Sequence, residues 1–268
     1  MAKRKAFSSR RIWILAIAIL LPVVLIVYHK QVIRYGYKAW RFQKRVFYKE
    51  SGRFSKIDYP AGYTVHGIDV SRWQPDINWS SLKTLNRDGD TIRFSFAFIK
   101  ATEGVLLEDP MFRDNWDAAR KNKITRGAYH YFLPSLDATL QAKNFISSVS
   151  LSKGDLPPVI DVEEKGRLTR KDLVKKLKVF IAIIEKEYKV KPILYSNISF
   201  IEDYLADDFP DYYFWIAHYY EEELKVEKSI QWLFWQHSDR AGIINSPGTY
   251  DANVFNGSNK DFIKILIR

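Results

Sequence analysis

Eight short apolar runs follow one another after Gly62, and they constrain the fold of this chain more than any other feature. Each run has the length and the β-branched or aromatic content that is typical of a buried strand. The runs are Thr64–Val70, Arg93–Lys100, Gly127–Phe132, Pro158–Glu163, Pro192–Ser196, Tyr213–Ala217, Trp232–His237 and a last one near Thr249. Eight is the number of strands in a β/α barrel.

Helical patterns separate the earlier runs. Amphipathic stretches span Pro110–Asn122, Asp137–Val149 and Thr169–Tyr188 and keep the 3.6-residue period. The connection at Glu221–Ser229 is too short and too charged for a crossover helix, so we expect that the last strands are not all parallel. The sequence therefore predicts an α/β fold. It is a modified TIM-like (β/α) barrel over residues 61–268, with eight strands and fewer helices in its C-terminal part.

The residues before the barrel form three segments. Residues 1–11 contain five basic side chains, and residues 12–28 follow as an uncharged run just long enough to span hydrocarbon. We expect one N-terminal transmembrane helix here. A cleaved signal peptide is the alternative, although the run ends in Tyr28-His29-Lys30 and not in a small-x-small cleavage site. Residues 29–60 are predicted to form a basic juxtamembrane stalk, either as an amphipathic helix on anionic lipid or as a solvated linker.

The net charge of +11 belongs to these N-terminal segments. Residues 1–56 hold 14 Lys and Arg against one Glu, which leaves 28 basic and 30 acidic residues for the rest of the chain. The barrel region is therefore close to neutral, and this balance argues against nucleic acid as a partner. The absence of cysteine excludes a thiolate nucleophile, a disulfide and a cysteine-ligated zinc site.

Two acidic residues end the apolar run that begins at Leu156. Asp161 and Glu163 are two residues apart, and a strand alternates sides with a period of two. Both side chains should therefore leave the same face, about 6.6 Å apart along the strand. Glycosidases use a carboxylic acid and a second carboxylate at separations of roughly 5–9.5 Å. The alternative is a solvated strand exit, where acidic residues are common.

Further polar and aromatic residues occur where the predicted strands end. This end of a β/α barrel forms the active-site face, so we expect them to share one site. They are Asp69, Lys100, Glu103, Tyr129, His130, Tyr195, Trp215, Trp235, Gln236 and Asp251. We expect His130 to be a hydrogen-bonded residue of the barrel mouth and not a metal ligand, because no H-x-H or H-E-x-x-H pair is present. Trp215 and Trp235 suit either the core or the stacking of sugar rings.

In their order along the chain, these segments resemble the strand motifs of the glycoside hydrolase family 25 lysozymes. The resemblance runs from about residue 64 to residue 257, and residues 1–60 lie outside it. It is carried by Gly67–Gln74, Ile99–Gly104, Arg126–Phe132, Pro158–Glu163, Pro192–Asn197, Phe214–Ala217, Trp235–Ser238 and Tyr250–Phe255. It implies a modified barrel, without cofactor or metal, that hydrolyses the β-1,4 bond between N-acetylmuramic acid and N-acetylglucosamine in peptidoglycan.

The resemblance also implies roles for single residues. Glu163 would be the general acid, Asp161 its partner, and Asp69 and Asp251 the other carboxylates of the site. We expect these neighbours to keep Glu163 protonated near neutral pH while Asp161 stays charged. Retention assisted by the substrate's acetamido group is favoured, and a covalent glycosyl-enzyme is the alternative. Substrate contacts are expected from Lys100, Glu103, Tyr129, His130, Tyr195, Trp215, Trp235 and Gln236.

The expected partners follow from this interpretation. Peptidoglycan glycan strands would be the substrate, membrane lipid would hold the N-terminal segment, and the protein is expected to be a monomer. The barrel should lie outside the cytoplasm, anchored to the membrane, or secreted if the N-terminal segment is cleaved. A catalytically silent glycan-binding module is the main alternative, although clustered carboxylates without a catalytic use would cost stability. Remodelling of the cell's own wall and attack on foreign walls both stay open.

Overall fold

The computed structural model describes residues 28–29, 31–33, 35–36, 57–74 and 76–268. The chain divides into two units, Met1–Tyr48 and Lys49–Arg268. In the first unit, residues 29, 31–33 and 35–36 are helical. The predicted membrane span lies outside the described residues apart from Tyr28. Within the described ranges, every helix is too short or too polar to cross a bilayer.

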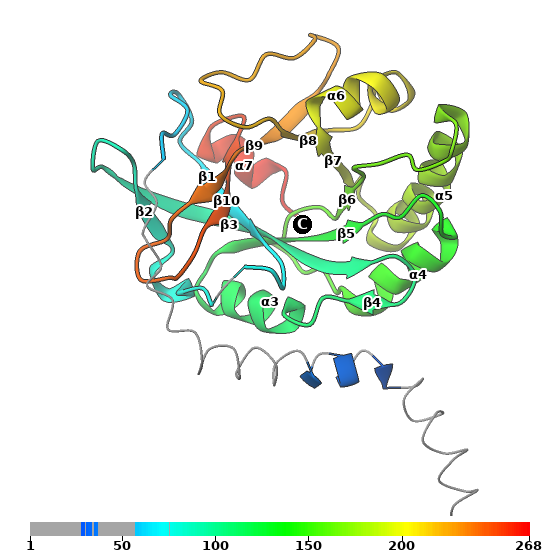
Figure 1. The fold of residues 1–268 in the computed structure, drawn as a ribbon, viewed down its shortest axis with the longest axis horizontal. Helices are drawn as coiled ribbons and strands as arrows, with labels where there is room; N and C mark the ends of the chain where they lie inside the picture. The colour runs from blue at the N-terminus through cyan, green and yellow to red at the C-terminus, as the bar shows by residue number, and fades with distance from the viewer. Residues whose placement is uncertain (1–27, 30, 34, 37–56, 75) are drawn as a thin grey trace, which may run out of the picture. The chain divides into compact units, whose positions relative to one another are not determined.

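A closed barrel forms the second unit (Figure 1). Within the described part of the chain, eight strands hydrogen-bond in the order β1-β10-β9-β8-β7-β6-β5-β3, and a β1–β3 pairing closes the ring. This confirms the predicted eight-stranded α/β barrel. The strands are β1 (His66–Val70), β3 (Thr91–Glu103), β5 (Thr125–Tyr131), β6 (Val159–Asp161), β7 (Ile193–Asn197), β8 (Phe214–Ala217), β9 (Trp232–Ala241) and β10 (Tyr250–Phe255).

One strand runs against the others. β10 pairs antiparallel with both β1 and β9, whereas the other described neighbours in the ring are parallel. Residues 218–231, between β8 and β9, contain no helix, as their length and charge predicted. The reversal of β10 places the start of this strand at the end of β1, so Asp251 lies opposite Asp69. Short connections in the last part of the chain therefore help to shape the mouth of the barrel.

Helices cover part of the outer surface of the barrel. α3 (Phe112–Lys121) packs against β3 and β5, and α4 (Ala138–Ser148) packs against α5 (Arg170–Tyr188). Asp137 caps α4 and Thr169 caps α5, because each side chain accepts a hydrogen bond from a backbone N–H of the first turn. The shorter elements are η1 (Trp79–Ser81), β2 (Lys83–Leu85), β4 (Leu107–Glu108), α6 (Ile198–Phe200), the π-turn η2 (Ile201–Leu205), η3 (Ala206–Asp208) and α7 (Asn259–Lys264).

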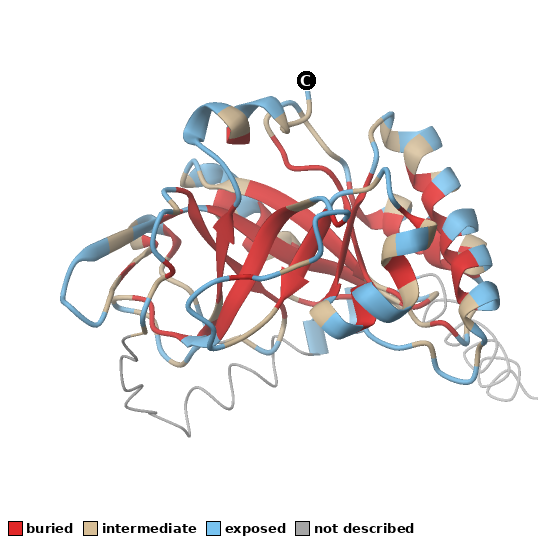
Figure 2. Cartoon of the chain, turned by 90° about the horizontal axis from the view of Figure 1, so that it is seen from above, coloured by how far each residue is buried: buried red, intermediate tan, exposed pale blue. Residues whose placement is uncertain are grey.

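Aromatic rings fill the inside of the barrel. Figure 2 shows that the strands around them are largely buried. Phe96 and Phe98 lie on β3, and their rings contact each other. Phe262 of α7 packs against Phe96 from the end of the barrel opposite the mouth. Two glycines make room for these rings. A Cβ atom would come within 2.4 Å of Phe96 at Gly67, and within 2.6 Å of Phe98 at Gly127. The interior is thus a packed core, and substrate access is restricted to the mouth.

The segment before β1 also belongs to the barrel's packing. The ring centroid of Tyr59 lies 5.4 Å from that of His66 and 5.2 Å from that of His237. Tyr63 lies 6.0 Å from Trp235 in the same way. Both tyrosines are half-buried and pack against the outer core. The packed region therefore begins a few residues before the predicted start at residue 61.

This packing predicts two different results of N-terminal truncation. Deleting residues 1–56 should leave a barrel with an unchanged Tm. Deleting residues 1–63 removes Tyr59 and Tyr63 as well, and the lost burial should cost roughly 2–4 kcal/mol. For a domain of this size, that corresponds to a fall in Tm of about 4–16 °C. Calorimetry on both proteins makes the measurement, and equal Tm values would contradict the packing role of the segment.

Candidate functional site

Carboxyl groups converge at the mouth of the barrel, where β1, β6 and β10 place them. Asp69 lies near the end of β1 and faces Asp251 across the antiparallel pairing. Asp161 ends β6, and the chain continues the strand's alternation beyond it, because Val162 packs in the outer core. Glu163 then returns to the side of Asp161, and the two side chains interact. The structure therefore brings the four predicted carboxyl groups to one end of the barrel.

Asp69 and Asp251 are neighbouring carboxyl groups on paired strands. Asp69 is 6% exposed, and its Oδ2 accepts hydrogen bonds from Gln236 Nε2 (2.7 Å) and Asn253 Nδ2 (2.8 Å). Asp251 Oδ2 accepts one from Gln74 Nε2 (3.2 Å). Burial, followed by the charge of Asp251, raises the pKa of Asp69 well above its usual range. Burial also raises the pKa of Asp251 to about 6.

Asp161 is a buried carboxyl group with one oxygen that lacks a hydrogen-bond partner in the described structure. It is 5% exposed, and this oxygen is Oδ1. Burial raises its pKa well above the usual range, and the charge of Glu163 adds to this effect. Lys100 opposes the shift with its positive charge. The desolvation of this carboxyl therefore outweighs the attraction of the nearby lysine in setting the direction of the shift. The expectation that Asp161 stays charged remains a prediction.

Glu163 is the carboxyl group that reaches solvent. It lines a cavity of about 370 Å³ together with Tyr195, His218 and Tyr219. Asp161 and Glu163 thus combine one buried and one exposed carboxyl group. A bound substrate could receive a proton from the exposed group while a polar atom of the same substrate approaches the buried one.

Two amides hold Asp69, and neighbouring aromatic residues orient both. Tyr195 and Tyr219 donate their hydroxyl hydrogens to Gln236 Oε1, each at 2.7 Å. Trp215 Nε1 donates to Asn253 Oδ1, also at 2.7 Å. Because each amide oxygen is already bonded, each NH₂ group is directed at Asp69. These contacts fix the carboxylate in one orientation.

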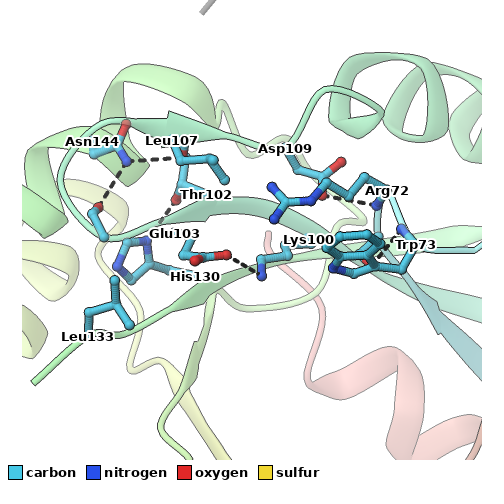
Figure 3. A network of polar contacts seen from close by, with 12 residues as sticks. Arg72, Trp73, Lys100, Thr102, Glu103, Leu107, Asp109, His130, Leu133 and Asn144 are labelled. Atoms are coloured by element: carbon cyan, nitrogen blue, oxygen red, sulfur yellow. Dashed lines mark hydrogen bonds and ion pairs between the residues drawn. The ribbon is translucent and has the colours of Figure 1, made fainter. Parts of the chain in front are cut away.

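A second polar network borders the mouth (Figure 3). Lys100 Nζ forms an ion pair of 2.8 Å with Glu103 and lies 4.7 Å from the ring centroid of Tyr131. Asp109, only 1% exposed, accepts backbone N–H groups from Arg72 (3.0 Å) and Met111 (2.9 Å). Its carboxylate therefore fastens the loop after β1 to the start of α3.

Two predicted contact residues face away from the mouth. His130 is fully buried against the helices, where its ring stacks on Phe180 at 4.9 Å. Its Nδ1 is 2.7 Å from Thr102 Oγ1, its Nε2 is 3.2 Å from Gln141 Oε1, and burial lowers its pKa to about 3. Trp235 is also fully buried on the outer face of the strands and donates to the His218 carbonyl at 2.7 Å. Neither position allows direct contact with a sugar.

Other predicted residues lie inside the barrel. Trp215 is 2% exposed and stacks on Phe98 at 4.3 Å, so it is a core residue and not an open platform for a sugar ring. Tyr129 is 8% exposed, and the charges of Asp69 and Asp161 contribute, after burial, to raising its pKa. It therefore lies beneath the carboxyl groups. Among the described residues, no group of three or more His, Asp or Glu side chains could hold a metal ion.

Trp73, which follows β1, was not among the predicted site residues. Its side chain is 70% exposed, and the Arg72 guanidinium lies 4.7 Å from its ring centroid. Its backbone N–H donates to Ser71 Oγ (3.2 Å), and Ser71 is held by Gln74, the residue that also contacts Asp251. A large aromatic side chain on a loop fastened to the site is suited to stack on a sugar ring. Its place four residues after Asp69, in the loop that follows the same strand, was the available signal.

Replacing Trp73 with alanine should weaken substrate binding more than catalysis. The loss of one exposed aromatic face should raise KM roughly tenfold, with kcat changed by less than about threefold. Steady-state kinetics on soluble glycan fragments measures both constants. Tyr213→Ala removes another exposed aromatic side chain, which lies before β8 at the other end of the barrel, and provides the control. Equal KM values for the two variants would argue against a stacking role.

The electrostatics of Asp251 predict a stability change with a defined sign. Its folded-state pKa of about 6 lies above the ordinary value of 3.8. The stability that this carboxyl contributes is therefore present below about pH 3.8 and is lost as pH rises through about 6. Asp251→Asn should raise the stability by roughly 2 kcal/mol at pH 7, or about 4–8 °C in Tm, and change it little at pH 3.5. Calorimetry at both pH values measures this, and a variant that is less stable at pH 7 would contradict it.

The fold and the site together define a class of protein. A closed eight-stranded barrel with carboxyl groups gathered at the carboxyl ends of its strands is an architecture of the glycoside hydrolases. The chain belongs to glycosyl hydrolases family 25, which matches residues 68–245.

Related proteins and structures agree with this assignment. "Uncharacterized protein YegX" of Escherichia coli O6:H1 is 42% identical over 255 residues, which cover 94% of this chain and 92% of that protein. "Lysozyme M1" of Streptomyces globisporus is 33% identical over 211 residues, or 72% and 68% of the two chains. A family 25 glycosyl hydrolase structure from Bacillus anthracis superposes with a TM-score of 0.70 at 33% identity, over 80% of this chain and 99% of the other. A bacterial lysozyme structure from Streptomyces coelicolor gives 0.67 at 30% identity, over 76% and 97%.

Proposed function

We propose that this protein is a muramidase that hydrolyses the β-1,4 bond between N-acetylmuramic acid and N-acetylglucosamine in peptidoglycan. The observation that carries the proposal is the pairing of a buried Asp161 with an exposed Glu163 at the mouth of the barrel. Membership of a family that contains named lysozymes supports the choice of substrate.

In the proposed reaction, Glu163 donates its proton to the glycosidic oxygen while the bond from this oxygen to C1 of N-acetylmuramic acid breaks. The carbonyl oxygen of the acetamido group on this N-acetylmuramic acid attacks C1 and forms a cyclic oxazolinium ion. Asp161 accepts the acetamide N–H and stabilises the positive charge, a role that suits its unpartnered Oδ1. Water then attacks C1 and gives its proton to Glu163, which restores the acid. Two displacements at C1 give net retention of configuration.

Digestion of purified peptidoglycan tests this function. Residues 57–268 should release soluble fragments, and mass spectrometry should find N-acetylmuramic acid at the new reducing ends. N-acetylglucosamine at these ends would replace the muramidase by a glucosaminidase. Binding without any new reducing end would support a silent binding module instead. NMR of the first product anomer separates retention from inversion.

We also propose that the N-terminal segment anchors the enzyme, with the barrel outside the cytoplasm. The uncharged run at residues 12–28 supports an anchor, but basic residues flank it on both sides and do not fix its orientation. The location of peptidoglycan selects the outward orientation. Protease added to cells with a permeable outer layer and an intact cytoplasmic membrane should remove the barrel. Protection of the barrel until this membrane is lysed would reverse the topology and place the substrate out of reach.

A further inference from the structure

A second cavity, of about 660 Å³, lies on the outer side of β9. Its wall combines the segment before β1 with residues that follow β8 and with the end of β9. Its charged lining residues are Asp58, Arg87, Glu221, Glu222 and Arg240, and they lie beside Tyr59, Tyr220 and His237. Its volume falls in the range of pockets that hold small molecules or short peptides.

This cavity borders the carboxyl pair at the mouth. Tyr220 follows Tyr219, whose hydroxyl group holds Gln236 against Asp69. The hydrogen bond from Tyr220 to Asp239 is the main cause of the raised pKa of Tyr220, and the charge of Asp251 contributes to it. After burial, the charge of Asp239 in turn contributes to raising the pKa of Asp251. The strand pairing gives the geometry: Ser238 lines the cavity and pairs with Ala252, the residue after Asp251, so the wall of the cavity adjoins the Asp69–Asp251 pair.

The wall presents charges of both signs on aromatic support. The Arg240 guanidinium lies 4.9 Å from the ring centroid of Tyr220 and 3.6 Å from Asp239. Arg87 forms an ion pair of 2.9 Å with Asp58, and both side chains are mostly exposed. Glu222 supplies an exposed carboxylate. His237 is 3% exposed, and its Nε2 is buried without a hydrogen-bond partner in the described structure. A ligand that suits this wall carries carboxylates and an ammonium group.

We propose that this cavity binds the short peptide that peptidoglycan carries on its muramic acid residues. The inference rests on the proposed function, since only a glycan held at the mouth would direct its attached peptide into the neighbouring cavity. Such a peptide bears carboxylates and a free amine. The carboxylates suit Arg87 and Arg240, which would exchange part of their exposed ion pairs with Asp58 and Asp239, and the amine suits Glu221 and Glu222. The cavity would make peptide-bearing glycan a better substrate than bare glycan.

Two forms of one substrate test this proposal. Peptidoglycan is compared with the same material after an amidase has removed its peptides, and kcat/KM is measured on each. The wild-type protein should prefer the peptide-bearing form by roughly tenfold. Arg240→Gln and Glu222→Gln should each remove most of this preference and leave kcat/KM on the bare glycan within about twofold. Arg120→Gln changes an exposed arginine on α3, outside the cavity, and should behave as wild type on both forms.

The peptides that the amidase releases provide an independent measurement. Their binding to the full-length protein is titrated by calorimetry, and Arg240→Gln should weaken it roughly tenfold. Equal activity of the wild-type protein on both glycans, or equal binding by both proteins, would overturn the proposal. If neither glycan is cleaved, the muramidase function fails, and the titration alone decides whether the cavity binds the peptide.

Discussion

Replacing Glu163 with glutamine is expected to lower kcat for glycan hydrolysis by on the order of 10²–10⁴-fold, the usual contribution of general acid catalysis. The amide keeps the size and polarity of the side chain but cannot give a proton to the leaving oxygen. Because Glu163 is exposed and glutamine can keep a hydrogen bond with Asp161, Tm and glycan affinity should stay nearly unchanged. Steady-state kinetics, calorimetry and binding to insoluble peptidoglycan measure the three quantities.

The next residue in the chain provides a matched control. Glu164 is also an exposed glutamate, and Glu164→Gln makes the same chemical change one residue away from the predicted acid. It should retain at least half of the wild-type kcat. If Glu163→Gln keeps more than a tenth of the wild-type turnover, the proton comes from another group and the proposed assignment fails.

Periodicity made most of the fold predictable. The apolar runs identified the strands because buried parallel strands need continuous hydrophobic sequence. The three long helices followed from their 3.6-residue period. The antiparallel β10 was expected only through the short connections before it, because strand direction depends on how the last strands close the ring. The structure of the N-terminal segment cannot be compared in this way, since the predicted span lies almost wholly outside the described residues.

The same periodicity could have corrected two site residues. Asp161 and Glu163 were placed on one face because they are two residues apart. By that rule, Tyr129 and His130 must lie on opposite faces, and so must Trp235 and Gln236. The structure shows this alternation: Tyr129 and Gln236 point inward, while His130 and Trp235 pack outside. Grouping neighbours by their place at a strand end ignored the direction of their side chains.

Other features of the site depend on contacts that are distant in sequence. Asn253 holds Asp69 across 184 residues, and Gln236 does so across 167. The burial of Asp161 also results from strands that meet only in the folded barrel. The sequence could not show that desolvation raises the pKa of Asp161, because it shows neighbouring charges but not the water that burial removes.

That burial leads to the second large effect, which concerns Asp161. In the proposed mechanism its carboxylate accepts the acetamide N–H and stabilises a positive charge in a nearly dry site. Asp161→Asn should lower kcat by on the order of 10²–10³-fold, the cost of losing one preorganised electrostatic contact. A thiazoline analogue of the oxazolinium ion should bind the variant less tightly than it binds the wild-type protein, because the carboxylate that pairs with its ring is gone. A covalent aspartyl intermediate, trapped by rapid quenching and seen by intact mass, would instead support the alternative route.

The pH dependence of this variant follows from the direction of the pKa shift. The wild-type rate should fall as pH drops through the raised pKa of Asp161, because only the ionised form can act. The variant should lose this part of the acid limb while keeping the part that other carboxyl groups cause. Stability should change in the opposite sense. A carboxyl with a raised folded-state pKa destabilises the fold as pH rises through that pKa, so Asp161→Asn should be more stable than wild type at pH 7 and nearly equal to it below about pH 3.8. A variant that loses both activity and stability at pH 7 would show that Asp161 supports the fold, and its catalytic role would then lack this evidence.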